Sequence, residues 1–209
     1  MRTPNTPKKI FNVFFLLFTG IALYLIGAYG MIFNYIPKYI TPLELVFQLG
    51  IALLLLFLVL LSQSAISFYI FALILGTFHQ SFFRNASLID SNIVLNALLL
   101  TCFIFGGLTF IAFWCPTSGK FITYGSLYTI LLNITWLLFL NLFLHNELLD
   151  LCLICISIGI FSLYTIKDIQ QITNDDNGPV YHALNLFLNF VNFFVDIIRL
   201  LIKIKKSKK

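Results

Sequence analysis

The sequence predicts an all-α membrane protein, a bundle of seven transmembrane helices with the C-terminal helix at its centre. The chain is 60% hydrophobic and 10% charged, whereas soluble domains are about 45–50% apolar and about 25% charged. Its mean hydropathy is +0.97. The 209 residues accommodate about seven spans of about 20 residues with short loops. We therefore expect a basic tail at residues 1–9, one membrane domain at 10–202 and a second basic tail at 203–209.

Apolar runs bounded by polar or helix-breaking residues define the expected helices. They cover residues 10–33, 43–62, 65–83, 93–114, 121–144, 148–166 and 181–202. Seven glycines in or near these runs predict close helix packing, because small residues let helix backbones approach each other. These glycines are Gly20, Gly27, Gly30, Gly76, Gly106, Gly107 and Gly125. Cys152 and Cys155 form a CxxC inside a continuous apolar run, and we expect both to pack in the core.

The last run carries one polar stripe, which predicts its place in the bundle. Asn185, Asn189, Asn192, Asp196 and Arg199 recur at spacings of four, three, four and three residues, which places all five on one helix face. A charged side chain in hydrocarbon costs about 2.5–3.5 kcal/mol. The stripe is therefore expected to face protein or trapped water, with the other helices packed around it.

Positive charge is concentrated in the two tails. The net charge is +5, and the tail residues that supply it are Arg2, Lys8, Lys9, Lys203, Lys205, Lys206, Lys208 and Lys209. This pattern predicts contact with the lipid bilayer and no binding of nucleic acid. The charge bias marks both tails as cytoplasmic, which seven crossings forbid, so either the last segment is re-entrant or one tail departs from the bias. We expect the C-terminal tail to be cytoplasmic, in a bacterial inner membrane or in the endoplasmic reticulum or Golgi of a eukaryote or virus.

Motifs for enzymatic chemistry and for resident metals are missing from the sequence. It has no HExxH, no GxSxG and no protease-type aspartate pair, so we expect no enzymatic activity and no cofactor. His79, His145 and His182 lack metal-ligand spacing. Asp175 and Asp176 superficially suggest a calcium loop, but the later carboxylate ligand is missing. Turn chemistry explains this segment.

Three segments, in order, resemble the Bax inhibitor-1 family over about residues 67–201. Residues 97–109 are similar to its apolar run followed by Thr and by Phe-Gly-Gly-Leu. Residues 165–172 resemble its D-x-Q-x-I motif, and residues 183–200 resemble its A-L-x-L-Y-L-D-x-I-N-L-F signature. The resemblance implies a bundle whose last helix is surrounded by the first six. It also implies a calcium-leak channel, with Ca²⁺ as the permeating ion, or a regulator of cell death or membrane proteostasis.

The same resemblance implies a gate made of two aspartates, one from each of the last two helices. Two carboxylates in a low-dielectric site cannot both ionise cheaply, so one pKa rises toward neutrality. Asp168 matches the first aspartate, but Asn189 stands at the position of the second. An alternative alignment puts Thr165 at the first position; we prefer Asp168 because the rest of the D-x-Q-x-I motif then fits. In either alignment the pH-sensing pair is incomplete.

The candidate gate and pathway residues are Asp168, Asn189, Asp196, Arg199, Asn185 and Asn192. Asp168 is either a solvated charge at a helix end or a gate residue, and a contact with Asn189 would hold the last two helices together. Asp196 lies about 10 Å beyond Asn189 along the helix axis. Arg199, three residues on, either neutralises Asp196 or leaves it free to attract cations.

The resemblance, together with these residues, implies two alternative functions. The first is a passive cation leak, with calcium as the expected ion and flux of the purified protein as its signature. The second is a non-conducting regulator of cell death or of a membrane quality-control protease, which requires a membrane-protein partner. The oligomeric state is left open by the sequence.

Overall fold

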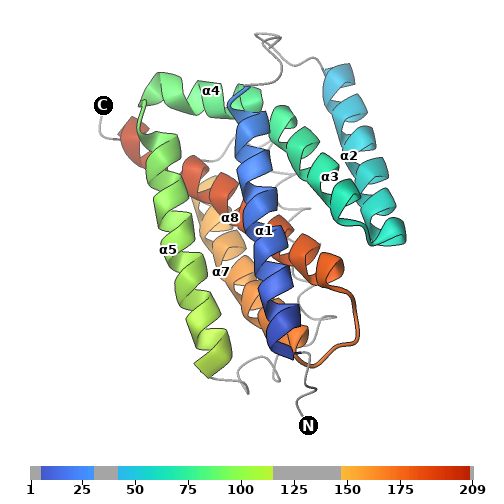
Figure 1. Ribbon diagram of the computed structural model, residues 1–209. Coiled ribbons are helices and arrows are strands. Elements are labelled where there is room, and N and C mark those ends of the chain that lie inside the picture. The colour runs from blue at the N-terminus through green and yellow to red at the C-terminus, as the bar shows by residue number, and fades with distance from the viewer. Residues whose placement is uncertain (1–5, 31–41, 115–146, 208–209) are drawn as a thin grey trace. The chain divides into compact units, whose positions relative to one another are not determined.

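The described part of the chain is entirely helical. The computed structural model describes residues 6–30, 42–114 and 147–207, and no strand occurs among them. Its helices are α1 (Thr6–Ala28), α2 (Pro42–Ser62), α3 (Ala65–Phe78), α4 (Gln80–Ile89), α5 (Ile93–Trp114), α7 (Glu147–Ile172) and α8 (Pro179–Ser207) (Figure 1). Three of the described helices are long and apolar enough to cross a membrane, or four if the bent α3–α4 pair is one span. The predicted all-α membrane fold is confirmed.

Most of the expected spans coincide with helices, and most of the differences lie at their ends. The expected span at 121–144 lies outside the described residues, as do Cys115, Gly125 and His145. The last two helices are longer than predicted, since α7 continues to Ile172 and α8 begins at Pro179. The first helix ends at Ala28, earlier than predicted, because Gly30 adopts a left-handed φ of 70°. Glycine tolerates this conformation at a helix C-terminus without steric cost.

The chain forms two compact units that share the last helix. The first unit contains residues Met1–Asp90 and Asp175–Phe187, and the second contains Ser91–Asn174 and Leu188–Lys209. The first unit therefore holds α1 to α4 and the start of α8, and the second holds α5, α7 and the remainder of α8. α8 carries more buried side chains than any other described helix. It contributes to the core of both units.

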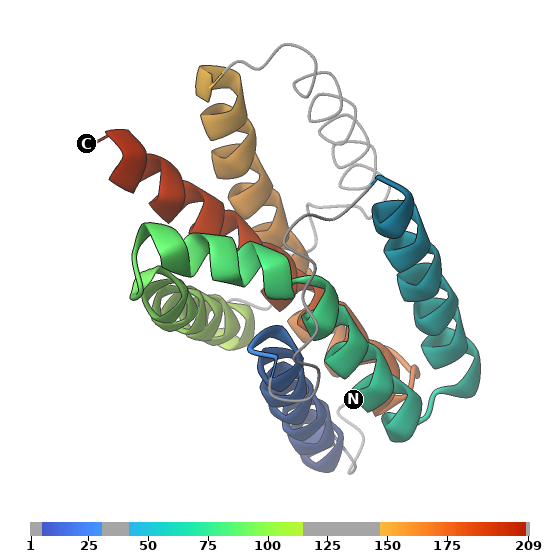
Figure 2. The same cartoon turned by 90° about the horizontal axis from the view of Figure 1, so that it is seen from above.

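In the first unit, α3 lies between α1 and α2 in both views (Figures 1 and 2). Glycines allow the close approach of α1 and α3. A Cβ built on Gly20 would lie 2.7 Å from the Phe68 ring, and one on Gly76 would overlap the backbone carbonyl of Tyr24. Phe187 of α8 packs edge-on against Phe68, with ring centroids 5.4 Å apart. The packing role predicted for Gly20 and Gly76 is therefore present in the fold.

The predicted helix 65–83 is broken at His79, which corrects the sequence expectation. His79 has φ −87° and ψ 0°, and α4 leaves α3 at an angle of 45°. The His79 ring hydrogen-bonds with the Leu75 carbonyl at 3.0 Å, and the Thr77 hydroxyl donates to the Ile74 carbonyl at 2.7 Å. Side chains that bond to carbonyls of the preceding turn bend helices. The hydropathy of this run did not reveal the bend.

In the second unit, α5 and α7 are neighbours (Figure 1). Gln170 of α7 donates to the Ala112 carbonyl of α5 at 3.3 Å, and Phe190 of α8 lies 5.6 Å from Phe105 of α5, measured between ring centroids. Two packing predictions are wrong here. A Cβ on Gly106 or Gly107 meets no neighbouring atom within 4 Å in the described structure.

The CxxC cysteines also depart from the prediction of core packing. Cys152 and Cys155 are both exposed. They lie three residues apart on α7, so they share one face, whereas the buried residues of that helix, such as Leu153 and Ile154, lie on another. The apolar character of the run did not distinguish its outward face from its inward face.

The close approach of α1 and α3 gives a test of the fold. Gly76→Ala places a methyl group against the Tyr24 backbone and is expected to destabilise the protein by about 1–3 kcal/mol. Gly107→Ala is the matched control, because its methyl group meets open space and alanine favours helix by up to about 1 kcal/mol. Thermal unfolding in detergent measures both. Equal unfolding temperatures for the two variants would contradict the packing.

Candidate functional site

The candidate site lies along the contact between α7 and α8 within the second unit, here called the α7–α8 seam. Three polar contacts define it: Asp168 with Asn189, Ser157 with Asp196, and Asp150 with Lys203. Residue numbers fall along α7 as they rise along α8, so the two helices run antiparallel. Each contact contains one aspartate. The seam therefore carries carboxylates at three levels.

The inner contact joins Asp168 and Asn189. The Asn189 side-chain amide donates a hydrogen bond to the Asp168 carboxylate at 2.7 Å, and the two residues are 5% and 7% exposed. Asp168 is buried near the end of α7, so the interpretation as a solvated charge is wrong. The pairing supports the alignment that matches Asp168 to the first family aspartate. Thr165, the alternative, donates its hydroxyl to the Phe161 carbonyl of its own helix at 2.8 Å.

The middle contact joins Asp196 and Ser157. The Ser157 hydroxyl donates to Asp196 Oδ2 at 2.6 Å, and Asp196 is 7% exposed. Arg199 approaches Asp196 Oδ1 only at 3.9 Å, with a side chain that is 48% exposed. Exposed ion pairs at this spacing stabilise helices by about 0.3–0.5 kcal/mol. The short hydrogen bond from Ser157 is therefore the principal contact of Asp196 in the seam, and Arg199 adds a weaker attraction.

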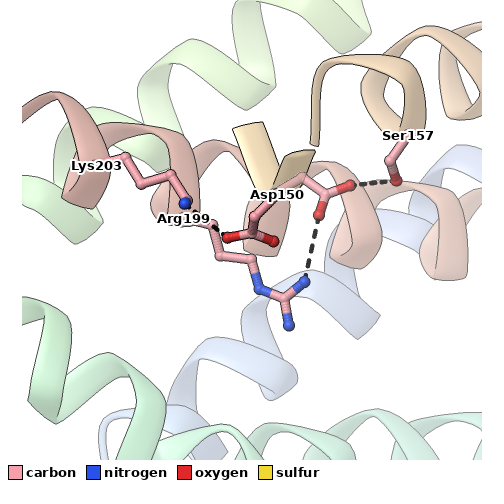
Figure 3. Close-up of polar contacts among 5 residues, drawn as sticks. Asp150, Ser157, Arg199 and Lys203 are labelled. Carbon is pink, nitrogen blue, oxygen red and sulfur yellow. Dashed lines mark hydrogen bonds and ion pairs between the residues drawn. The ribbon is translucent and has the colours of Figure 1, made fainter. Parts of the chain in front are cut away.

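The outer contact is an ion pair between Lys203 Nζ and Asp150 Oδ2 at 2.7 Å. Figure 3 shows Lys203 reaching toward Asp150, with Ser157 and Arg199 close by. Sequence reasoning missed both Asp150 and Ser157. One signal was available: Asp150, Ser157 and Asp168 are spaced by seven and eleven residues, which places them on one helix face. That face meets the polar stripe of α8.

The stripe on α8 is only partly buried, which corrects the expectation that all five residues face protein. Asn189 and Asp196 are buried and Asn185 is half-buried, whereas Asn192 and Arg199 are exposed. At about 100° per residue the stripe is about 80° wide. Its buried members lie along one edge and its exposed members along the other. The α7 contacts therefore involve the Asn189 and Asp196 edge.

The turn before α8 is explained by its own hydrogen bonds. Asn177 donates its backbone N–H to the Asp175 carboxylate at 3.1 Å, and its side-chain amide donates to the other carboxylate oxygen. Desolvation acts to raise the pKa of the Asp175 carboxyl, but these hydrogen bonds outweigh it and the pKa lies below its ordinary value. The Lys9 ammonium donates to the Asp175 carbonyl within the first unit. These contacts account for the aspartate as a turn residue.

Several apolar helices of membrane-spanning length, with buried carboxylates on two of the helices, define an α-helical integral membrane protein. The sequence matches the family described as "Inhibitor of apoptosis-promoting Bax1" over residues 6–207. The chain belongs to the Bax inhibitor-1 family, and the predicted membership is confirmed. It is also 32% identical over 111 residues to an uncharacterized protein of Campylobacter jejuni. That alignment covers 52% of this chain and 47% of the relative, so the match extends over about half of each protein.

The inner contact predicts a specific loss of stability. Asn189→Ala removes the amide that donates to a buried carboxylate, so we expect a loss of about 1–3 kcal/mol. Asn192→Ala, one turn along α8 and exposed, is the control and is expected to change stability by less than about 0.5 kcal/mol. Unfolding of the purified variants in detergent gives both values. A loss of the same size in both variants would show that the hydrogen bond stabilises nothing.

Proposed function

We propose that the chain is a passive cation leak, with calcium as its principal ion, and that ions follow the α7–α8 seam. The observation that carries this proposal is the pair of buried carboxylates, Asp168 and Asp196, at successive levels of one helix contact. Ionisable groups inside membrane domains are costly and usually mark ion pathways. Membership of the Bax inhibitor-1 family supports the same activity.

The Asp168–Asn189 contact determines how strongly the proposed leak is expected to depend on pH. Asn189 is an amide, so the Asp168–Asn189 contact holds one titratable group where an aspartate pair would hold two. Adjacent carboxylates repel each other and share a proton near neutral pH. A carboxylate with an amide partner lacks this repulsion. We therefore propose a leak that changes only weakly with pH.

The same contact favours a second candidate function. Asn189 ties Asp168 into a fixed contact between α7 and α8, which suits a non-conducting protein that regulates cell death or a membrane quality-control protease through a membrane-protein partner. Such a regulator would retain its partner on purification and carry no flux. We propose no catalytic step and no bound cofactor for either function.

We also propose the membrane in which the chain lies and the side on which its C-terminal tail lies. We propose a bacterial inner membrane, supported by the similarity to a Campylobacter jejuni protein, with the lysine-rich C-terminal tail in the cytoplasm. Endoplasmic reticulum or Golgi membranes apply if the chain is eukaryotic or viral. Lysines near membrane helices favour the cytoplasmic face.

Calcium flux into proteoliposomes tests the leak. Asp168→Asn and Asp196→Asn each remove a seam carboxylate and are expected to reduce flux several-fold, because a buried negative charge offsets the cost of dehydrating a cation. Asp176→Asn removes an exposed carboxylate outside the seam and is expected to leave flux unchanged. Absence of flux in wild-type vesicles, together with a co-purifying membrane protein, would favour the regulator.

Restoring the second acid tests the pH argument. Wild-type flux is expected to change little between about pH 6 and pH 8, whereas Asn189→Asp creates an aspartate pair that takes up a proton in this range and makes flux strongly pH-dependent. Flux measured at both pH values, with Asn192→Asp as the exposed control, decides the matter. A steep wild-type response that disappears in Asp168→Asn would refute this account.

A further inference from the structure

The Asp150–Lys203 ion pair, the outer contact of the seam, lies in line with the other seam contacts along α7 and α8. Lys203 lies seven residues after Asp196 on α8, and Asp150 lies seven residues before Ser157 on α7. Seven residues advance a helix by about two turns, or about 10 Å, with little change of face. The Asp150–Lys203 ion pair therefore lies directly beyond the Ser157–Asp196 hydrogen bond, at the next level of the seam (Figure 3).

Exposure rises toward this end of the seam. The Asp196 side chain is 10% exposed, whereas those of Lys203 and Asp150 are 27% and 35% exposed. Lys203 makes a second contact, a hydrogen bond of 3.4 Å to the carbonyl of Glu147, the first residue of α7. One ammonium group thus ties the C-terminal part of α8 to the first turn of α7 in front of a buried carboxylate.

Two basic side chains and the Asp150 carboxylate lie at this end of the seam. Arg199 lies on α8 between the middle and outer levels and is 3.9 Å from Asp196. A cation that approaches Asp196 along the seam from this end meets the Lys203 ammonium, which is paired with Asp150, and the Arg199 guanidinium, whose exposed side chain lets water weaken the repulsion. Asp150 keeps the Lys203 ammonium in this position through the 2.7 Å ion pair.

We propose that Asp150 and Lys203 form an ionic latch that closes the outer end of the α7–α8 seam, and that release of this latch gives cations access to Asp196. The proposal rests on the proposed cation leak and adds its regulation. In the latched state, Lys203 holds the helix ends together and places a positive charge in front of the buried carboxylate. In the released state, the α7 start and the α8 end separate, and Asp196 meets water.

Two measurements on the full-length protein in phosphatidylcholine–phosphatidylglycerol vesicles test the latch. The first is calcium flux. The second is the reaction of the Asp196 carboxyl with a water-soluble carbodiimide and glycinamide, quantified by mass spectrometry, which reports exposure without any need for conduction. Lys203→Gln removes the latch charge and is expected to raise both signals by about threefold or more, the ratio expected for loss of a partly exposed ion pair.

Matched variants separate the latch from general effects of the lysine-rich tail. Lys206→Gln makes the same charge change on an exposed side chain three residues along and is expected to leave both signals at wild-type values. The exchanged pair Asp150→Lys with Lys203→Asp restores an ion pair of opposite polarity and is expected to return Asp196 labelling to the wild-type level, which also shows that the seam still folds.

The outcomes distinguish failure of the latch from failure of the cation leak. Equal Asp196 labelling in Lys203→Gln and Lys206→Gln overturns the latch, whatever the flux. Failure of the exchanged pair to lower labelling below that of Lys203→Gln also overturns it. Raised labelling in Lys203→Gln with no calcium flux in any variant supports the latch as a contact that closes the seam and overturns the cation leak.

Discussion

A buried carboxylate in an apolar helix bundle must find a hydrogen-bond donor, and this requirement organises the α7–α8 seam. Asp168 and Asp196 lie on opposite helices, and each receives a short hydrogen bond from the helix it faces. Leaving a charged group without its donor in such surroundings costs several kcal/mol. The antiparallel register of α7 and α8 is consistent with that requirement, because sliding either helix by one turn would break both hydrogen bonds together.

The first unit is held by a different kind of contact. Gly27 and Gly76 bring the backbones of α1 and α3 close enough that a side chain on either would overlap the neighbouring helix. Packing of this sort depends on shape and on dispersion forces, since lipid offers apolar groups no hydrophobic drive to associate. Tyr24 of α1 packs beside this glycine contact, and its ring lies edge-on against both Phe83 and Phe187. The protein thus combines a closely packed helix pair with a hydrogen-bonded one.

Sequence reasoning was sufficient for the class of fold and for half of the seam. Hydropathy located the helices because each span must be apolar throughout, and periodicity located the stripe because its members recur at helical spacing. Neither signal identified Ser157, since a serine in an apolar run is unremarkable until an aspartate is placed opposite it. Nor did either predict the break at His79, which depends on side-chain bonds to the preceding turn. The exposure of Asn192 and Arg199, on one edge of the stripe, could not be predicted, because burial depends on neighbouring helices that the pattern of a single helix does not specify.

The division of α8 between the two units bears on how the protein is made. Residues Asp175–Phe187 complete the first unit and residues Leu188–Lys209 complete the second. Because α8 follows the other described helices in the chain, both units lack part of their core during synthesis until α8 is made. Incompletely folded proteins of this kind expose apolar surface and are prone to aggregate. A chain without α8 would leave the cores of both units incomplete at once.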